Sequence, residues 1–261
     1  HCISSAASDV YKRQHMRKNR KLDELRNIEI ITNYSTHADG SCFIKFGDTH
    51  VLCNATVDEN PPRWLRNSGQ GWITAEYGML PTSTKERMSR ESVRGKQSGR
   101  TQEIQRLIGR SLRSIVNLSY LDGLQIILDC DVIQADGGTR TTSINGSFIA
   151  LKICIDKMIK KRLIKQDPLI DQLAAISCGI LDSNAYLDLD FEEDQSAGVD
   201  ANFVLTKTGK IVEVQMTSEK DLCSEENYLS MFSLAKSAVQ EIIKFQDLSL
   251  IHISEPTRPE R

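Results

Sequence analysis

The spacing of apolar residues changes from a strand-like to a helix-like period twice along this chain, and no other feature constrains the fold as strongly. In the first half, residues 41–46 and 49–57 alternate like strands and are joined by a Gly-Asp pair, which predicts a hairpin. A Gly- and Pro-punctuated loop is expected over 61–81. Apolar residues at three- and four-residue spacing then predict an amphipathic helix over 101–118.

The second half repeats this order. A strand over 124–133 carries two aspartates on its other face and leads through two glycines into a helix over about 142–161. Later strands are expected over 174–181, 185–191, 199–206 and 210–216, and a final helix from about 228 to 243. Two halves that each consist of strands followed by a helix predict an α+β domain with a weak internal duplication, in which mixed sheets pack on helices.

The two ends of the chain do not share this pattern. Residues 1–15 show no amphipathic period, and Met16 precedes a basic run as an ordinary start would. We therefore expect a native domain over 16–248, with non-native extensions over 1–15 and 249–261 that resemble translated sequencing-adapter read-through. Genuine disordered tails are the alternative, and they leave the functional argument unchanged.

Composition excludes several classes of protein. Hydrophobic residues make up 39% of the 261 residues, which permits a sizeable core and argues against disorder. No apolar run approaches the roughly 18 residues of a membrane span and no signal peptide is visible, so we expect a cytoplasmic protein without a membrane partner. The seven cysteines form no CxxC pair and are interpreted as buried reduced thiols rather than zinc ligands. Few histidines lie inside the chain, which argues against His-based hydrolysis.

The net charge of −2 hides a segregation of charge along the sequence. Nine basic residues and only three acidic ones lie between 82 and 114, whereas seven acidic residues and no basic one lie between 182 and 200. Two solvated faces are one interpretation. The other is that arginines meet phosphates while carboxylates hold a divalent cation, an arrangement that suits phosphoryl or nucleotidyl transfer.

The segment 134–146, QADGGTRTTSING, lies between a predicted strand and a predicted helix. Its two glycines let backbone amides approach a ligand, the helix N-terminus favours an anion, and Arg140 can donate two parallel hydrogen bonds to phosphate oxygens. Gly138, Thr139 and Arg140 therefore form a candidate phosphate cradle, with an ordinary Gly-Gly turn as the simpler interpretation. The segment has neither the P-loop nor the GxGxxG pattern.

Five stretches carry a family resemblance. They are FGDT at 46–49, GQGWITAEYGMLP at 69–81, GKQSGRTQEIQRLIGR at 95–110, LDCDV at 128–132 and QADGGTRT at 134–141. In this collinear order they resemble the ribonuclease PH family of phosphate-dependent 3′-to-5′ exoribonucleases, across essentially all of 16–248. The resemblance implies a ribonuclease PH-like fold. One departure is Thr82, where the family commonly has Arg, and it puts one RNA or subunit contact in doubt.

The resemblance also implies roles for individual residues. The phosphate-binding positions are matched by Arg100, Gly138, Thr139 and Arg140, the metal-binding carboxylates by Asp188 and Asp194, and basic positions that grip the RNA 3′ end by Arg87 and Arg90. Of these, the two aspartates and the two phosphate arginines are the expected catalytic residues. Mg²⁺ is the expected cofactor and inorganic phosphate the expected co-substrate.

Each choice has a structural alternative. Arg100 begins a helix and could lie on its solvated rim, and Asp188 alternates with leucines as an exposed strand residue would. Asp200 is a further acidic candidate. Trp72 and Tyr77 could stack on bases or pack in the core.

The two metal candidates are six residues apart, so in an unbroken strand they would lie about 20 Å from each other, too far to share one ion. We therefore expect the chain to turn back after Phe191, with residues 192–196 forming a loop.

Inorganic phosphate is already an oxyanion, so its attack on RNA chiefly requires that charge repulsion be neutralised, which arginines can do. We expect a phosphate-dependent exoribonuclease, or tRNA nucleotidyltransferase, that trims the 3′ ends of tRNA precursors, releases nucleoside diphosphates and also runs in reverse. The resemblance implies a homohexamer, a trimer of dimers. The alternative is a catalytically silent, RNA-binding ring subunit of an exosome-like assembly, which loss of the phosphate arginines or the aspartates would favour.

Overall fold

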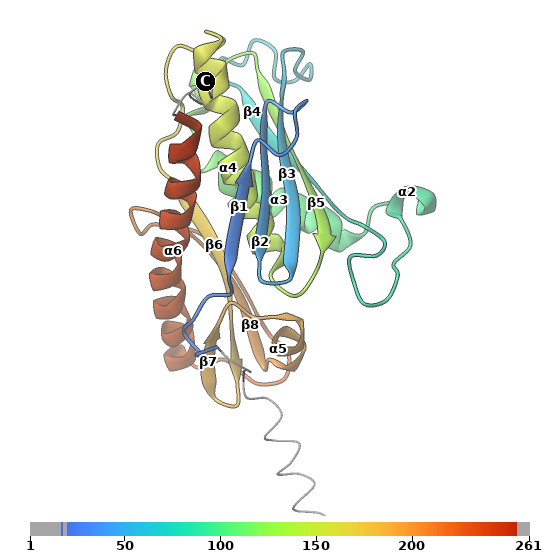
Figure 1. Ribbon diagram of the computed structural model, residues 1–261, viewed down its shortest axis with the longest axis vertical. Coiled ribbons are helices and arrows are strands. Elements are labelled where there is room, and N and C mark those ends of the chain that lie inside the picture. Colours follow the sequence, from blue (N-terminus) through green and yellow to red (C-terminus); the bar gives the residue numbers. More distant parts are fainter. Residues whose placement is uncertain (1–16, 18–19, 255–261) are drawn as a thin grey trace, which may run out of the picture.

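The computed structural model describes Arg17 and residues 20–254, and it places them in two β-sheets with helices between and beside them (Figure 1). The first sheet has the order β1-β2-β3-β5-β4 and consists of β1 (Ile28–Thr32), β2 (Gly40–Phe46), β3 (Thr49–Asp58), β4 (Trp72–Met79) and β5 (Gln125–Gln134). The second has the order β7-β6-β8-β9 and consists of β6 (Leu173–Leu181), β7 (Asn184–Leu187), β8 (Val199–Thr206) and β9 (Ile211–Ser218). The predicted α+β class is confirmed.

Strand pairing follows the predicted hairpin. Strands β2 and β3 are antiparallel, and the turn between them places Gly47 at φ 53°, in the left-handed region that glycine tolerates. All other neighbours are antiparallel too, except β4 and β5, which run parallel.

The interpretation of 61–81 as a loop is wrong for its second half, which forms the edge strand β4. Ile73, Ala75 and Tyr77 alternate toward the core as buried side chains. The strand was not recognised because its partner, β5, begins some fifty residues later in the chain, and because a glycine and a proline bracket it.

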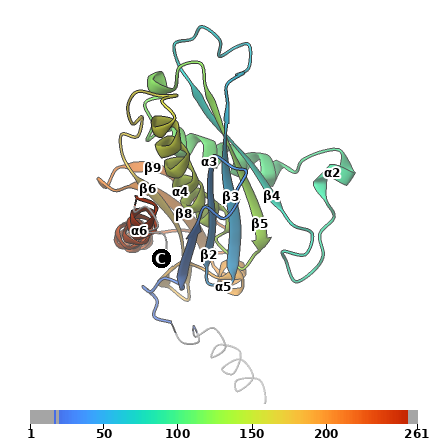
Figure 2. The same ribbon diagram turned by 45° about the horizontal axis from the view of Figure 1, so that its top comes forward.

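The helices form two layers (Figures 1 and 2). Helix α4 (Thr139–Lys160) lies between the sheets, in contact with β2 and β3 on one side and β6 on the other. Helix α3 (Gly99–Arg113) packs on β4, and the long α6 (Glu225–Ser254) runs along β6, β7 and β1. The short α2 (Glu91–Arg94) lies in a segment that projects from the body (Figure 2).

Several element boundaries differ from the sequence prediction: α6 spans Glu225–Ser254 instead of 228–243, and β7 ends at Leu187 instead of 191. Helix α3 ends at Arg113 and is followed by a separate 3-10 turn, η2 (Leu118–Leu121). Helix α4 begins at Thr139 instead of 142, so the candidate phosphate residues lie in its first turn. The expected loop at 192–196 is wrong, because α5 (Phe191–Ser196) is a helix capped by reciprocal bonds between Asp190 and Glu193.

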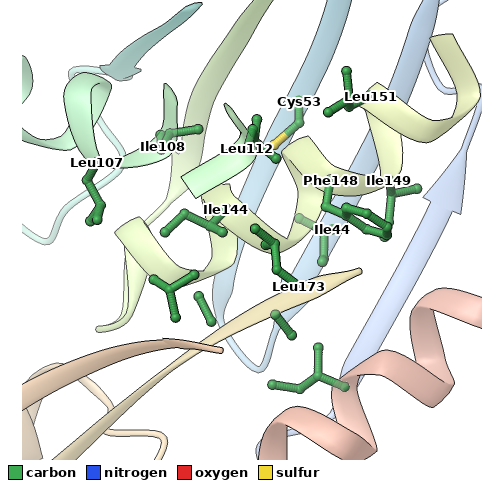
Figure 3. Close-up of a cluster of buried hydrophobic side chains, with 14 of the residues drawn as sticks. Ile44, Cys53, Leu107, Ile108, Leu112, Ile144, Phe148, Ile149, Leu151 and Leu173 are labelled. Atoms are coloured by element: carbon green, nitrogen blue, oxygen red, sulfur yellow. The ribbon is translucent and has the colours of Figure 1, made fainter. Parts of the chain in front are cut away.

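The core lies where α4 faces the first sheet, with side chains of α3 alongside (Figure 3). A Cβ atom on Gly146 would lie 2.7 Å from both Cys53 Sγ and Ile44 Cγ2, so only glycine allows α4 to approach β2 and β3 this closely. Each fully buried aliphatic side chain stabilises the fold by about 1.5–3 kcal/mol. Five of the six described cysteines are buried and none is bonded to another, which confirms the thiol prediction for them, while Cys223 is half-buried.

The structure describes the C-terminal end of the chain as far as Ser254. The expected extension over 1–15 lies outside the described residues. Helix α6, in contrast, passes position 248 without a break, and Leu250 packs against the core. Within the described part of the chain, no helix is both long enough and apolar enough to cross a membrane.

Candidate active site

The N-terminus of α4 is open to an anion. Gly137 and Gly138 have φ of 72° and 62°, and this pair of left-handed residues turns the chain from β5 into the helix. Gly138 occupies the N-cap position and has no side chain to bond the first-turn amides. The first turn holds no acidic residue, so the positive end of the helix dipole is not neutralised there.

Tyr77 of β4 braces this turn. Its hydroxyl lies 3.0 Å from Thr139 Oγ1, and burial raises the pKa of the phenol. The side chain is only 5% exposed, so its ring packs in the core and is not a platform for bases. Trp72 is half-buried; Arg113 lies over its ring at 4.3 Å, and Trp64 packs against it in a T-shaped pair.

Arg100 and Arg140 approach this turn from two helices. Arg140 lies in the first turn of α4, where its Nη1 donates to Gln215 Oε1 of β9 at 3.1 Å. Arg100 lies in the first turn of α3, two residues after the capping residue Ser98, and is exposed. Both guanidinium groups act electrostatically on Asp194 and lower its pKa.

Asp194 and Asp200 are carboxylates whose charge the protein does not fully neutralise. Asp194 is exposed, yet partial loss of water around its carboxyl group raises its pKa above the ordinary value, against the opposing effect of Arg100 and Arg140. Burial, the charge of Asp194 and that of Glu219 also raise the pKa of Asp200. The Oδ1 atom of Asp200 is buried and has no hydrogen-bond partner in the described structure.

Asp188 has a different environment. It is buried with a side-chain exposure of 1%, at a left-handed turn with φ of 54°. Arg26 donates to both carboxylate oxygens, from Nη2 at 2.7 Å and from its backbone amide at 2.8 Å, and Arg20 Nη1 lies 3.3 Å away. Burial opposes ionisation, yet the arginines hold the pKa of Asp188 below its ordinary value. The alternative of an exposed strand residue is therefore wrong.

Arg26 connects Asp188 to the phosphate turn. Its Nη1 donates to the carbonyl of Asp136, and a Cβ atom on Gly138 would lie 3.0 Å from its Nη2. The hydroxyl of Thr49 completes the support, because it accepts from the Asp136 amide and donates to the Gly137 carbonyl.

A second acidic residue, Glu193, forms ion pairs with Arg17 and Arg20, which precede the first strand. Sequence reasoning missed this cluster. The signal available was the basic run at the start of the domain opposite the acidic run of 182–200, but nothing local joined segments separated by about 170 residues.

The donor atoms permit a test of whether Mg²⁺ fits. This ion is usually held by one or two carboxylates and keeps several waters. Asp194 and Asp200, whose charges act on each other, are carboxylates that could serve in this way. Asp188 does not meet this description in the observed arrangement, because its carboxylate would have to release an arginine before it could bind the ion. In the described part of the chain, no three His, Cys, Asp or Glu side chains come together as a metal cage.

Arg87 and Arg90 are exposed, in the segment that leads into the projecting helix α2 (Figure 2). Thr82, the departure from the family pattern, is exposed where this segment begins. The basic and acidic runs do meet at the surface, where Lys85 Nζ lies 3.3 Å from Glu192 Oε1. Such exposed pairs contribute little stability. The pair nevertheless shows that the basic run of 82–114 and the acidic run of 182–200 touch at this point of the surface.

Comparison with known proteins agrees with this arrangement. A model of the 3′ exoribonuclease family, domain 1, matches residues 24–155, and a model of domain 2 of the same family matches residues 171–238. The two matched ranges divide the chain as the two sheets do.

Solved structures share the fold at low sequence identity. Rrp46 from rice (Oryza sativa) is 23% identical with a TM-score of 0.72, over 89% of this chain and 98% of that one. An Archaeoglobus fulgidus exosome with RNA bound to the active site contains a chain that is 20% identical with a TM-score of 0.75, over 92% and 96%. An archaeal exosome core chain is 19% identical with a TM-score of 0.72, over 93% and 95%. Since the family models match more than half of its length, the chain belongs to the 3′ exoribonuclease family.

Proposed function

We propose that this chain is a phosphorolytic exoribonuclease that uses inorganic phosphate to remove nucleotides from RNA 3′ ends. One observation carries the proposal, namely the N-terminus of α4, which has no side-chain cap, carries Arg140 in its first turn and has no acidic residue there. Backbone amides, a helix dipole and two guanidinium groups together favour a small anion there.

In this mechanism the protein positions and neutralises charge. The amides of the α4 turn and the two arginines hold phosphate and reduce its repulsion from the terminal phosphodiester. A phosphate oxygen then attacks that phosphorus, the bond to the 3′ oxygen of the preceding nucleotide breaks, and a nucleoside diphosphate leaves. Because the new phosphoanhydride conserves much of the bond energy, nucleotidyl transfer in the reverse direction belongs to the proposal.

Mg²⁺ stays part of the proposal as a cofactor, with Asp194 as the residue that would hold it and Asp200 beside it. When bound, it would supply positive charge near the scissile phosphate. The prediction that Asp188 shares this ion requires Arg26 or Arg20 to be displaced from its carboxylate.

RNA is proposed to reach the site along the projecting basic segment, with Arg87 and Arg90 in contact with its backbone phosphates. One similar solved chain, from an Archaeoglobus fulgidus exosome with RNA bound to the active site, supports this partner. The finer predictions, that the substrate is a tRNA precursor and that six identical chains form a ring of three dimers, rest on the family resemblance. Light scattering would test the ring, which should have six chain masses.

A catalytically silent ring subunit is the second candidate, because similar solved chains come from exosome assemblies. The chain has Arg100, Arg140 and Asp194, and the charges of both arginines act on Asp194, which supports catalysis over the silent alternative.

To separate the two candidates, a tRNA with a 3′ extension and an unstructured RNA with the same 3′ tail are incubated with the protein, with and without phosphate. We expect phosphate-dependent shortening of both, with the tRNA trimmed only to its folded stem. Binding of both RNAs without shortening at any phosphate concentration would favour the silent subunit.

A further inference from the structure

The orientation of Arg140 depends on a residue that the proposed chemistry does not use. Arginine has many rotamers, so a guanidinium group at a helix terminus binds an anion well only if its direction is fixed beforehand. In this structure Gln215 Oε1 accepts from Arg140 Nη1 at 3.1 Å. Gln215 lies on β9, an edge strand of the second sheet and far from α4 in sequence.

Gln215 is itself held in place. Its Nε2 donates to Glu213 Oε1 at 3.2 Å, two residues along β9 and therefore on the same face of the strand. Glu213 is bound by Arg110 through two hydrogen bonds, from Nε at 3.2 Å and from Nη2 at 2.5 Å. Arg110 lies on α3, the helix that also carries Arg100. The network thus connects both arginine-bearing helices through β9.

The Glu213 carboxylate fixes which way the Gln215 amide points. A carboxylate can only accept, so the amide nitrogen must face Glu213 and the amide oxygen must face Arg140. A rotated amide would place its NH₂ group against the guanidinium group, which has no acceptor.

A neutral acceptor suits this position. Gln215 orients Arg140 without cancelling its charge, whereas a carboxylate there would pair with the guanidinium group and compete with an incoming anion. Glu103 lies 3.6 Å from Arg140 Nη1, but it is 48% exposed, so water screens this pair. Asp194 and Asp200 also act on Arg140 electrostatically, without a hydrogen bond to it in the described structure.

We infer that Gln215, held by Glu213 and Arg110, is a positioning residue that presents Arg140 to inorganic phosphate with its charge intact. This inference rests on the proposed function.

The test compares Gln215→Met, which removes both hydrogen bonds at similar volume, with Gln215→Glu, which adds a charge. Ile211→Thr is the control, since Ile211 lies on the same strand and is 55% exposed. For each protein we would measure the dissociation constant of inorganic phosphate by calorimetry, the KM values for phosphate and for RNA, and the melting temperature.

We expect Gln215→Met to weaken phosphate binding and to raise the KM for phosphate by about three- to tenfold, as loss of one orienting hydrogen bond would. Gln215→Glu should weaken phosphate binding by more than tenfold, with the KM for RNA and the melting temperature near those of the parent. Unchanged phosphate binding in both variants would overturn the inference, as would equal changes in both KM values with a lowered melting temperature. A parent that binds phosphate without turnover would contradict the proposed function, while the binding constants still decide the role of Gln215.

Discussion

Replacement of Asp188 by Asn tests the most heavily bonded part of the site. The change keeps the size of the side chain but removes the charge that compensates Arg26, whose side chain is only 8% exposed, and Arg20. Breaking a buried ion pair by removal of one partner typically costs about 3–5 kcal/mol, because the remaining charge is buried without compensation. We expect a loss of that size in the free energy of unfolding at pH 7. That is a large fraction of the stability of an ordinary domain.

The pH dependence gives a second check. The pKa of Asp188 is lowered in the folded state, so its contribution is present above the ordinary aspartate value of about 3.9 and is lost as the pH falls through the lower folded value. The difference between parent and variant should therefore shrink below about pH 4.

Urea unfolding at fixed protein concentration would measure both effects, because any assembly makes stability concentration-dependent. Glu192→Gln is the matched control. Its carboxylate is 81% exposed, and the change should stay within about 0.5 kcal/mol. A loss below about 1 kcal/mol for Asp188→Asn, or a difference that does not change with pH, would refute the reasoning.

Three further predictions concern other residues. Asp194→Asn should keep or raise the free energy of unfolding at pH 7, because the raised pKa of Asp194 means that its ionised form disfavours folding. This advantage of the variant should vanish near pH 4, where the aspartate is protonated. A variant that is less stable than the parent in urea unfolding would contradict the prediction. Arg87→Ala and Arg90→Ala should each weaken RNA binding and reduce its salt dependence by about one phosphate contact, with an unchanged KM for phosphate. Fluorescence anisotropy across a salt series measures this dependence. A salt slope equal to that of the parent would argue against a phosphate contact. Of the six described cysteines, Cys223 should react first with a thiol reagent in the native protein, because the other five are buried. Burial also raises the pKa of the Cys154 thiol to about 12. Fast labelling of Cys42, Cys53, Cys130, Cys154 or Cys178 would contradict the packing.

Periodicity was sufficient to predict the two halves of the fold. The hairpin of β2 and β3 and the helix α4 carry their signals locally, in alternation and in three- to four-residue spacing. Strand β4 does not, because its fold depends on a parallel partner far along the chain.

The site was predicted in part for the same reason. Gly138, Thr139 and Arg140 are contiguous, and the charges of Arg140 and Arg100 both act on Asp194. The engagement of Asp188 by Arg26 could not be predicted, because it joins residues 162 positions apart. Gln215 was also missed, since a single glutamine on a strand carries no local signal for a role beside Arg140.

The source of the phosphate in the product tests the central claim most directly. Radiolabelled inorganic phosphate is supplied with unlabelled RNA, and the products of the parent and of Arg140→Ala are separated by thin-layer chromatography. The account predicts that the label appears in the β-phosphate of nucleoside diphosphates. In the variant, the KM for phosphate should be about ten- to a hundredfold higher at an unchanged RNA affinity, as loss of a charge-assisted contact would cause. Unlabelled nucleoside monophosphates, released equally well without phosphate, would contradict it.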